Sequence, residues 1–356
     1  MKKLINFIVL FLIIVLGIVY FTYGKKFLTL LDEKKVYNVE DIQTTKISTL
    51  DEYKFFYNGI LTYNNQKIIF LDYSNNVKWE SEDTEFANQV YITDNYIYRI
   101  MKNIIQIIDK SNQKFVTTEI KGNIINVSRE SGKIYLIAKG DSGRNSLYIM
   151  NENNEVVVDN KIIEGNITGI SISDKSEGYA LMTLKYENGI IINTVYFNLL
   201  DDVELWNTVI DDEILVKAKI INNNVVLIGT KNVYYYNTNG KLMWKNGIYN
   251  KILDYEISKD RQLIYILFEK NGSTELMAYN FEGKVVQINK TPSKVLKLKV
   301  YEDNIFVYNE NSIYLIHGIK TDKIYEDAEG IISDFTAIGN DIYILSKDKL
   351  VKGQIK

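Results

Sequence analysis

The chain has 356 residues, of which 46% are hydrophobic, and its 42 basic and 45 acidic residues give a formal net charge of -3. This hydrophobic share can build a sizeable core, and the scattered, balanced charge gives no electrostatic footprint for nucleic acid. There is no Cys and a single His, His317, which excludes disulfides, thiolate nucleophiles and multi-histidine metal sites and leaves a Ser/His/Asp triad one possible base.

The first predicted element is a transmembrane helix whose ends are Leu4 and Tyr23, because this run is apolar and contains no charged residue. Roughly 20 residues at about 1.5 Å each span a hydrocarbon core of about 30 Å. Lys2 and Lys3 precede the run, and a short tail with two lysines stays in the cytoplasm while the long C-terminal part is translocated. The sequence therefore predicts a single-pass protein with a cytoplasmic N-terminus.

Two other interpretations of this run are a cleaved signal peptide and a buried helix of a soluble domain. Residues 18–24 contain no small-x-small cleavage site, and without Cys there is no lipobox. The run also has no polar face, which disfavours the buried helix. We therefore expect an uncleaved signal anchor over residues 1–26 and a linker over residues 27–35.

The rest of the chain is predicted to be all-β, because short apolar runs alternate with Asn, Asp, Gly and Ser and no long stretch has helical periodicity. One type of run is nearly continuous in apolar residues, as expected for strands covered on both faces. Eight such runs occur, at residues 60–63, 96–98, 134–137, 179–182, 225–228, 264–267, 305–308 and 342–345.

A second strand follows most of these runs and ends in a polar turn residue at matching register: Asp72, Asp109, Asn151, Asn198, Asn237, Asn280 and His317. About seven residues later comes a position that is bulky or apolar in most units: Trp79, Val116, Val158, Trp206 (one residue late), Trp244, Gln287 and Ile324. All three tryptophans fall at this position, which indicates a repeat. We expect the tryptophans to pack between neighbouring units rather than to form a platform for ligands.

The repeat predicts an eight-bladed β-propeller over residues 36–356, with seven blades as the alternative. The units begin near Glu52, Asn88, Asn123, Asn166, Ile214, Lys251, Lys294 and Gly330, at intervals of roughly 35 to 48 residues. A four-stranded sheet cannot bury both of its faces alone, whereas a ring of sheets can. The last unit has room for three strands, so residues 36–48 are predicted to supply its outer strand and close the ring.

The segment 233–244, which reads VYYYNTNGKLMW, resembles the strand–turn–strand signature of quinoprotein-type (PQQ-like, WD40-like) propellers, and residues 68–79 are a poorer copy. The anchor followed by degenerate repeats also resembles uncharacterised single-pass, membrane-anchored propeller proteins of Gram-positive bacteria. The resemblance implies a fold and not a chemistry. Quinone-dependent members carry a disulfide that clasps the cofactor, so a chain without Cys is expected to bind no quinone, and we predict no cofactor and no metal site.

Most polar candidates for a site have a structural explanation. His317 occupies a turn position filled elsewhere by Asp or Asn, so we expect it to bond the local backbone. The acidic pairs at residues 201–202 and 211–212 lie in loops without a calcium-loop spacing. We predict no catalytic residue.

Longer loops are predicted between the second and third strands of three units, over residues 140–146, 186–193 and 269–275. Rigid scaffolds display binding residues on such loops, which makes Arg144, Tyr186, Glu187 and Asn271 the candidates for a binding face. Loop drift without selection is the competing explanation.

These patterns favour a non-catalytic, extracytoplasmic module that binds a protein or cell-envelope partner at the membrane. The alternative is a propeller-class hydrolase or lyase acting on carbohydrate, which would need titratable groups that converge on the central pocket. A sensor ectodomain is disfavoured, because only residues 1–3 would remain inside the cell.

Overall fold

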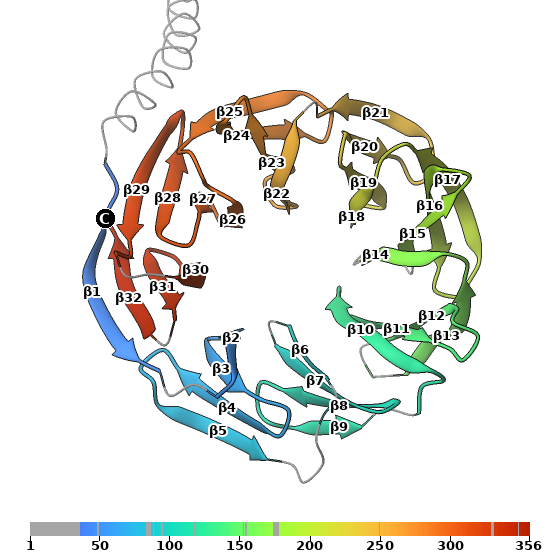
Figure 1. Ribbon diagram of the computed structural model, residues 1–356, viewed down its shortest axis with the longest axis horizontal. Helices are drawn as coiled ribbons and strands as arrows, with labels where there is room; N and C mark the ends of the chain where they lie inside the picture. Colours follow the sequence, from blue (N-terminus) through green and yellow to red (C-terminus); the bar gives the residue numbers. More distant parts are fainter. Residues whose placement is uncertain are drawn as a thin grey trace, which may run out of the picture.

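The apolar runs of the repeat form strands that are buried on both faces. The computed structural model describes residues 36–47, 50–82, 87, 89–93, 95–116, 119–151, 153, 155–173, 178–248, 250–328, 331–347 and 349–356. Within these residues, 32 strands form eight four-stranded sheets that stand around a central axis (Figure 1). The protein is an eight-bladed β-propeller, and the seven-bladed alternative is wrong.

Each blade is a simple antiparallel meander. From the innermost to the outermost strand, the first four blades are β2 (Glu52–Phe56), β3 (Gly59–Tyr63), β4 (Lys67–Asp72) and β5 (Val77–Glu82); β6 (Gln89–Ile92), β7 (Tyr96–Met101), β8 (Ile104–Asp109) and β9 (Lys114–Val116); β10 (Asn123–Glu130), β11 (Lys133–Lys139), β12 (Asn145–Met150) and β13 (Val156–Ile163); and β14 (Asn166–Ile172), β15 (Gly178–Glu187), β16 (Ile190–Leu199) and β17 (Glu204–Asp211).

Blades 5 to 8 follow in the same order. They are β18 (Leu215–Ile221), β19 (Asn224–Gly229), β20 (Asn232–Tyr236) and β21 (Leu242–Gly247); β22 (Lys251–Ser258), β23 (Leu263–Lys270), β24 (Ser273–Asn280) and β25 (Val285–Thr291); β26 (Lys297–Tyr301), β27 (Asn304–Tyr308), β28 (Ser312–His317) and β29 (Lys320–Glu326); and β30 (Ile332–Ile338), β31 (Asp341–Ser346), β32 (Lys349–Ile355) and β1 (Val39–Lys46).

The hydrophobic core lies between the blades. One cluster joins Ala180 and Met182 of β15 to Leu227 of β19 and Tyr234 of β20, so blades 4 and 5 share it. All four of these side chains are buried. Because each blade buries its faces only against its neighbours, the ring must close for the whole core to form.

The N-terminal strand closes the ring. β1 pairs antiparallel with β32, with Val39 opposite Ile355 and Lys46 opposite Lys349. The backbone groups of Asn38 and Lys356 exchange two hydrogen bonds of 3.0 and 2.9 Å. This is the place that the repeat count assigns to residues 36–48.

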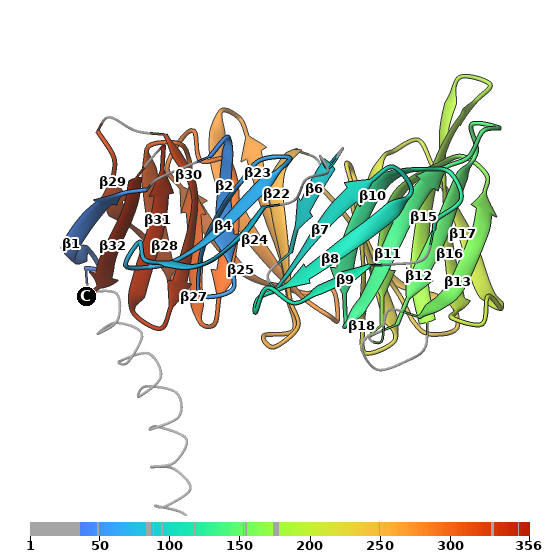
Figure 2. The same cartoon turned by 90° about the horizontal axis from the view of Figure 1, so that it is seen from below.

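The turns of the meander alternate between two faces of the ring. We call the face that holds Lys356 and the start of β1 the terminal face; it also carries the turns between first and second strands and between third and fourth strands. The opposite face, the loop face, carries the turns between second and third strands and the connections between blades. Figure 2 shows the end of the chain on one face and the β15–β16 hairpin on the other.

The predicted signal anchor, with its ends at Leu4 and Tyr23, and the predicted linker lie outside the described residues. Among the residues that are described, no helix is long and apolar enough to cross a membrane.

Candidate functional site

Most of the polar residues that recur at matching positions of the repeat are Asp and Asn side chains that cap turns. In blade 5, Asn237 Oδ1 accepts hydrogen bonds from the backbone N–H groups of Asn239, at 3.0 Å, and Lys241, at 2.9 Å. Gly240 supplies the left-handed conformation of this turn, with a φ of 74°. The same pair of side-chain bonds occurs at Asp72, Asp109, Asn151 and Asn280.

The three tryptophans join each blade to the capped turn of the next one. The indole N–H groups of Trp79, Trp206 and Trp244 donate to the backbone carbonyls of the residue after the cap in the next blade. For Trp244 this acceptor is Phe281, at 2.9 Å. Its ring also stacks on Tyr235, the cross-strand neighbour, with ring centroids 5.5 Å apart. The tryptophans therefore lie between blades, in the place expected for packing.

Asn198 does not cap its turn, which corrects one expectation. The turn begins one residue later, where the N–H of Leu199 donates to the carbonyl of Val203 and Asp202 takes the left-handed position with a φ of 69°. Asn198 is instead buried, and its Oδ1 accepts a hydrogen bond of 3.1 Å from Lys161 Nζ. This shift by one residue explains why Trp206 comes one position late.

The junction between blades 6 and 7 has a polar residue at the tryptophan position, which apolar residues fill at three other junctions without a tryptophan: Val116, Val158 and Ile324. Gln287 occupies the tryptophan position, and its cross-strand neighbour is Ala278 instead of an aromatic residue. Gln287 Nε2 still donates toward the carbonyl of Gly318, the residue after the cap position of blade 7, but at 3.4 Å. The turn it meets has only two residues between His317 and Lys320, which pair with each other.

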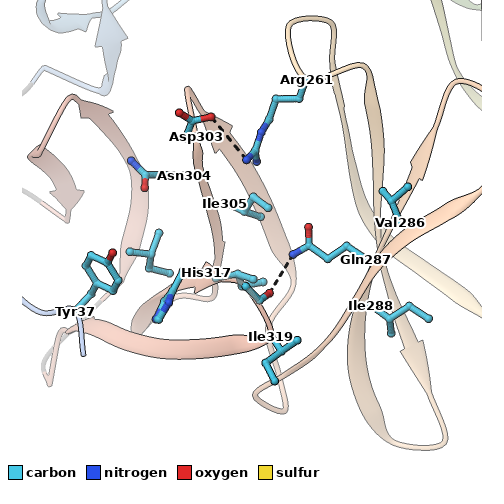
Figure 3. A pocket seen from close by; sticks show the side chains of 13 residues that line it. Tyr37, Arg261, Val286, Gln287, Ile288, Asp303, Asn304, Ile305, His317 and Ile319 are labelled. Atoms are coloured by element: carbon cyan, nitrogen blue, oxygen red, sulfur yellow. Dashed lines mark hydrogen bonds and ion pairs between the residues drawn. The ribbon is translucent and has the colours of Figure 1, made fainter. Parts of the chain in front are cut away.

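An open cleft of about 550 Å³ lies here, on the terminal face. It runs across the end of blade 7, from Val286, Gln287 and Ile288 of β25 to Tyr37, which precedes β1 (Figure 3). Its size is within the range of about 300–1,000 Å³ that ligand pockets have. Its lining includes three exposed apolar residues, since Val286 is 52% exposed, Ile288 54% and Ile319 74%.

Charged groups lie at both ends of the cleft. Arg261, in the turn after β22, forms an ion pair of 3.7 Å with Asp303, in the turn after β26. At the other end, His317 Nε2 lies 2.8 Å from Asp322 Oδ2, and the ring of Tyr37 meets the ring of His317 edge-on, with centroids 4.7 Å apart. The side chain of His317 thus pairs with a carboxylate, whereas the sequence predicted a bond to the local backbone.

Asp322 is a buried carboxylate that several donors hold in place. Burial alone would raise the pKa of Asp322, but hydrogen bonds with His317, with the backbone N–H of Tyr37 and with Lys320 outweigh it and lower that pKa below its usual value. A carboxylate engaged in this way orients the imidazole of His317. The residues that line the cleft include no Ser, Thr or Lys side chain that such a pair could activate.

Carboxylates on the innermost strands join these strands to one another. Glu130 of β10 accepts hydrogen bonds from Ser171 Oγ, at 3.0 Å, and from the N–H of Ile172, at 2.9 Å, and forms an ion pair with Lys219 of β18. Burial raises the pKa of one carboxyl among the described residues, that of Glu256 on β22. Within the part of the chain that the structure describes, no group of three or more His, Asp and Glu side chains is placed to hold a metal ion.

The four predicted binding residues lie on the loop face, away from the cleft. Arg144 is in the loop over residues 140–144 of blade 3, and it borders a small cavity of about 200 Å³. Tyr186, which is 73% exposed, and Glu187 end β15 in blade 4, and Asn271 begins the β23–β24 turn in blade 6. They come from three blades, and their binding role stays a prediction.

Two of the three long loops predicted on this face are wrong. β15 and β16 extend through most of residues 186–193, and β23 and β24 through most of residues 269–275. Each pair of strands is joined by a two-residue Asn-Gly turn, with φ values of 51° and 84° at Asn188 and Gly189 and of 50° and 79° at Asn271 and Gly272. Both residues of such a turn need positive φ, which Asn and Gly adopt readily.

Comparisons with known proteins agree with the fold. Residues 31–353 match the model of a family described as "Family of unknown function (DUF5711)". No curated protein matches the chain.

Among solved structures, BamB from Moraxella catarrhalis has 11% identity and a TM-score of 0.52, with 88% of this chain and 100% of that chain covered. Sqt1 from Chaetomium thermophilum has 10% identity, a TM-score of 0.55 and coverage of 88% and 99%. Apo AztD from Citrobacter koseri has 9% identity, a TM-score of 0.55 and coverage of 80% and 87%. At such identities the likeness shows the propeller fold alone.

Proposed function

The chain belongs to the family of unknown function DUF5711, and we propose that it is a non-catalytic binding module, anchored in the cytoplasmic membrane, whose propeller stands outside the cell membrane and holds a protein partner. The observation that carries this proposal is the cleft across the end of blade 7. It combines exposed apolar residues, Val286, Ile288 and Ile319, with a few fixed polar groups, and binding sites have this composition.

The position of the cleft supports a partner at the membrane. Tyr37, which borders the cleft, is preceded by the predicted linker over residues 27–35, and nine extended residues span at most about 30 Å. The terminal face would therefore stay close to the bilayer in which residues 4–23 are proposed to lie. A partner that is itself a membrane protein would meet this face first.

The state of the acidic groups supports a role without catalysis. A glycosidase needs two carboxyl groups whose environments separate their pKa values on either side of a substrate. Here Asp322 and Glu130 are held by several donors each, which suits a structural role. Among the described residues, Glu256 is the carboxyl whose pKa burial raises, so it is the group to change when turnover is tested.

Crosslinking of the full chain in its native membrane, followed by identification of the captured proteins, tests this function. We expect one partner to be captured reproducibly from the wild type. The same membranes are assayed for turnover of cell-envelope carbohydrate by the wild type and by Glu256→Gln. If no partner is captured and the wild type turns over carbohydrate while Glu256→Gln does not, the protein is an enzyme and the proposed binding function is wrong.

A further inference from the structure

The chain itself shows what fits between the outer edges of its blades. At the junction of blades 5 and 6, the ring of Trp244 lies over Gly283 and its N–H donates to the carbonyl of Phe281. The ring of Trp206 lies over Gly240 in the same way and donates to Thr238. These two junctions thus offer an indole a backbone surface without a Cβ atom and one carbonyl acceptor, whereas the turn that Trp79 meets offers the carbonyl of Lys110 and has Asn112 in the left-handed position.

The junction of blades 6 and 7 keeps this acceptor but lacks the indole. The carbonyl of Gly318 takes the place of those of Phe281 and Thr238, and Gln287 takes the place of the tryptophan. The amide of Gln287 has a better acceptor in Asn289 Oδ1, at 2.7 Å, than in Gly318, at 3.4 Å. The carbonyl of Gly318 also accepts a hydrogen bond of 2.9 Å from Asn289 Nδ2, so a new donor would replace only the weak bond from Gln287, at the second lone pair of this carbonyl.

We propose that the Gln287 end of the cleft receives an aromatic side chain, a tryptophan above all, from the partner protein. This inference rests on the proposed function and names the chemistry that the partner must present. The inserted indole would lie beside the side chain of Gln287 and donate its N–H to the carbonyl of Gly318. A buried aromatic anchor of this kind carries much of the energy of many protein interfaces.

The polar groups at the two ends of the cleft can surround the aromatic side chain that the partner inserts. Arg261 and Asp303 form a partly exposed ion pair at one side, and His317 with Tyr37 borders the other. Polar and aromatic groups around an apolar centre form the rim that excludes water from an anchor residue. The anchor would thus enter between the two ends, beside Gly318.

The test measures binding of N-acetyl-L-tryptophanamide to the full chain in lipid nanodiscs by saturation-transfer NMR. The wild type is expected to bind the probe. Gln287→Trp places an indole of the chain itself in the cleft, as Trp244 does at the junction of blades 5 and 6. It is expected to weaken probe binding by about tenfold or more. Met243→Trp is the matched control, because it adds an indole on the outer strand of blade 5 at an exposed position, 54% exposed, and should leave binding unchanged.

A second variant, Trp244→Gln, keeps the test informative if Gln287→Trp does not fold. Trp244→Gln should open a second cleft and raise the amount of probe bound per chain. No binding to the wild type, or equal binding to the wild type and to a folded Gln287→Trp, would overturn the inference. Phe27 is the aromatic residue at the start of the predicted linker. Probe binding that occurs only after Phe27→Ala would mean that the chain's own N-terminal segment fills the cleft, and would also overturn the inference. In each of these cases capture of a partner in native membranes could still succeed through another surface, so the binding function would stand.

Discussion

Trp244 lies directly over Gly283: a Cβ atom placed on Gly283 would come within 2.8 Å of the indole ring. Gly272 has nearly the same backbone, with a φ of 79° against 80° for Gly283, but a Cβ atom there would meet nothing within 4 Å. The two glycines therefore separate the cost of backbone strain from the cost of displacing the indole.

We predict that Gly272→Ala lowers the free energy of unfolding by about 1–2 kcal/mol, the cost of a side chain in the left-handed region. Gly283→Ala should cost about 1–3 kcal/mol more, because it also overpacks the junction. Urea unfolding of both variants measures the difference. Equal losses would mean that the tryptophan contact does not hold blades 5 and 6 together.

Closure of the ring by β1 can be tested within one strand. Val39 is buried against Val351 and Ile355, whereas Ile42 is 52% exposed. Val39→Asp places an unpaired charge in the closing contact and should lower the free energy of unfolding by several kcal/mol, whereas Ile42→Asp should change it by about 0.5 kcal/mol or less. Proteolysis before Lys46 should accelerate only in Val39→Asp. Similar behaviour of both variants would contradict closure by this strand.

The free energy of unfolding should depend on pH through Asp322. Its pKa is lowered in the folded protein, so the unfolded chain binds its proton more tightly, and the stabilisation is present above about pH 4 and is lost as the pH falls through the folded value. Asp322→Asn should be less stable than the wild type at pH 7 by about 1.5–3 kcal/mol, and this gap should narrow toward pH 3.

Urea unfolding between pH 3 and 7 measures the gap. Asp303→Asn is the control, because this side chain is 96% exposed and its ion pair with Arg261 should contribute less than about 1 kcal/mol. A gap for Asp322→Asn that stays constant with pH would show that its carboxylate does not stabilise the fold by charge.

The proposed orientation in the membrane can be measured with single cysteines, because the natural chain has none. Tyr186→Cys, at an exposed position of the loop face, should react with a membrane-impermeant maleimide on intact cells. Lys2→Cys should react only after the membrane is permeabilised. The reverse pattern would place the propeller in the cytoplasm.

The strand order could be predicted from the sequence because its signals are local. Repeat units predicted to begin near Glu52, Asn123, Asn166 and Lys251 have their first strands beginning at those residues. Continuous apolar runs between turn residues identified the second strands, and the tryptophan register identified the junctions between blades. Both patterns arise from contacts that every blade repeats.

The cleft could not be predicted in this way, because it depends on departures from the repeat. The sequence shows Gln287 at the position that tryptophan fills in three other blades. The effect of Gln287 depends, however, on the short turn after His317, which brings Gly318 and Asp322 into place. The Asn-Gly turns at residues 188–189 and 271–272 were a readable hairpin signal, and overlooking it produced two loops that are strands.

Site-specific photo-crosslinking in native membranes tests most directly whether the protein binds a partner through its terminal face. A photo-crosslinking amino acid replaces Ile319, which is 74% exposed at the cleft, or Tyr186, on the loop face. We predict that position 319 captures one partner at a peptide containing an aromatic residue, and that Gln287→Trp abolishes this adduct. Capture from position 186 alone, unchanged by Gln287→Trp, would contradict binding at the cleft.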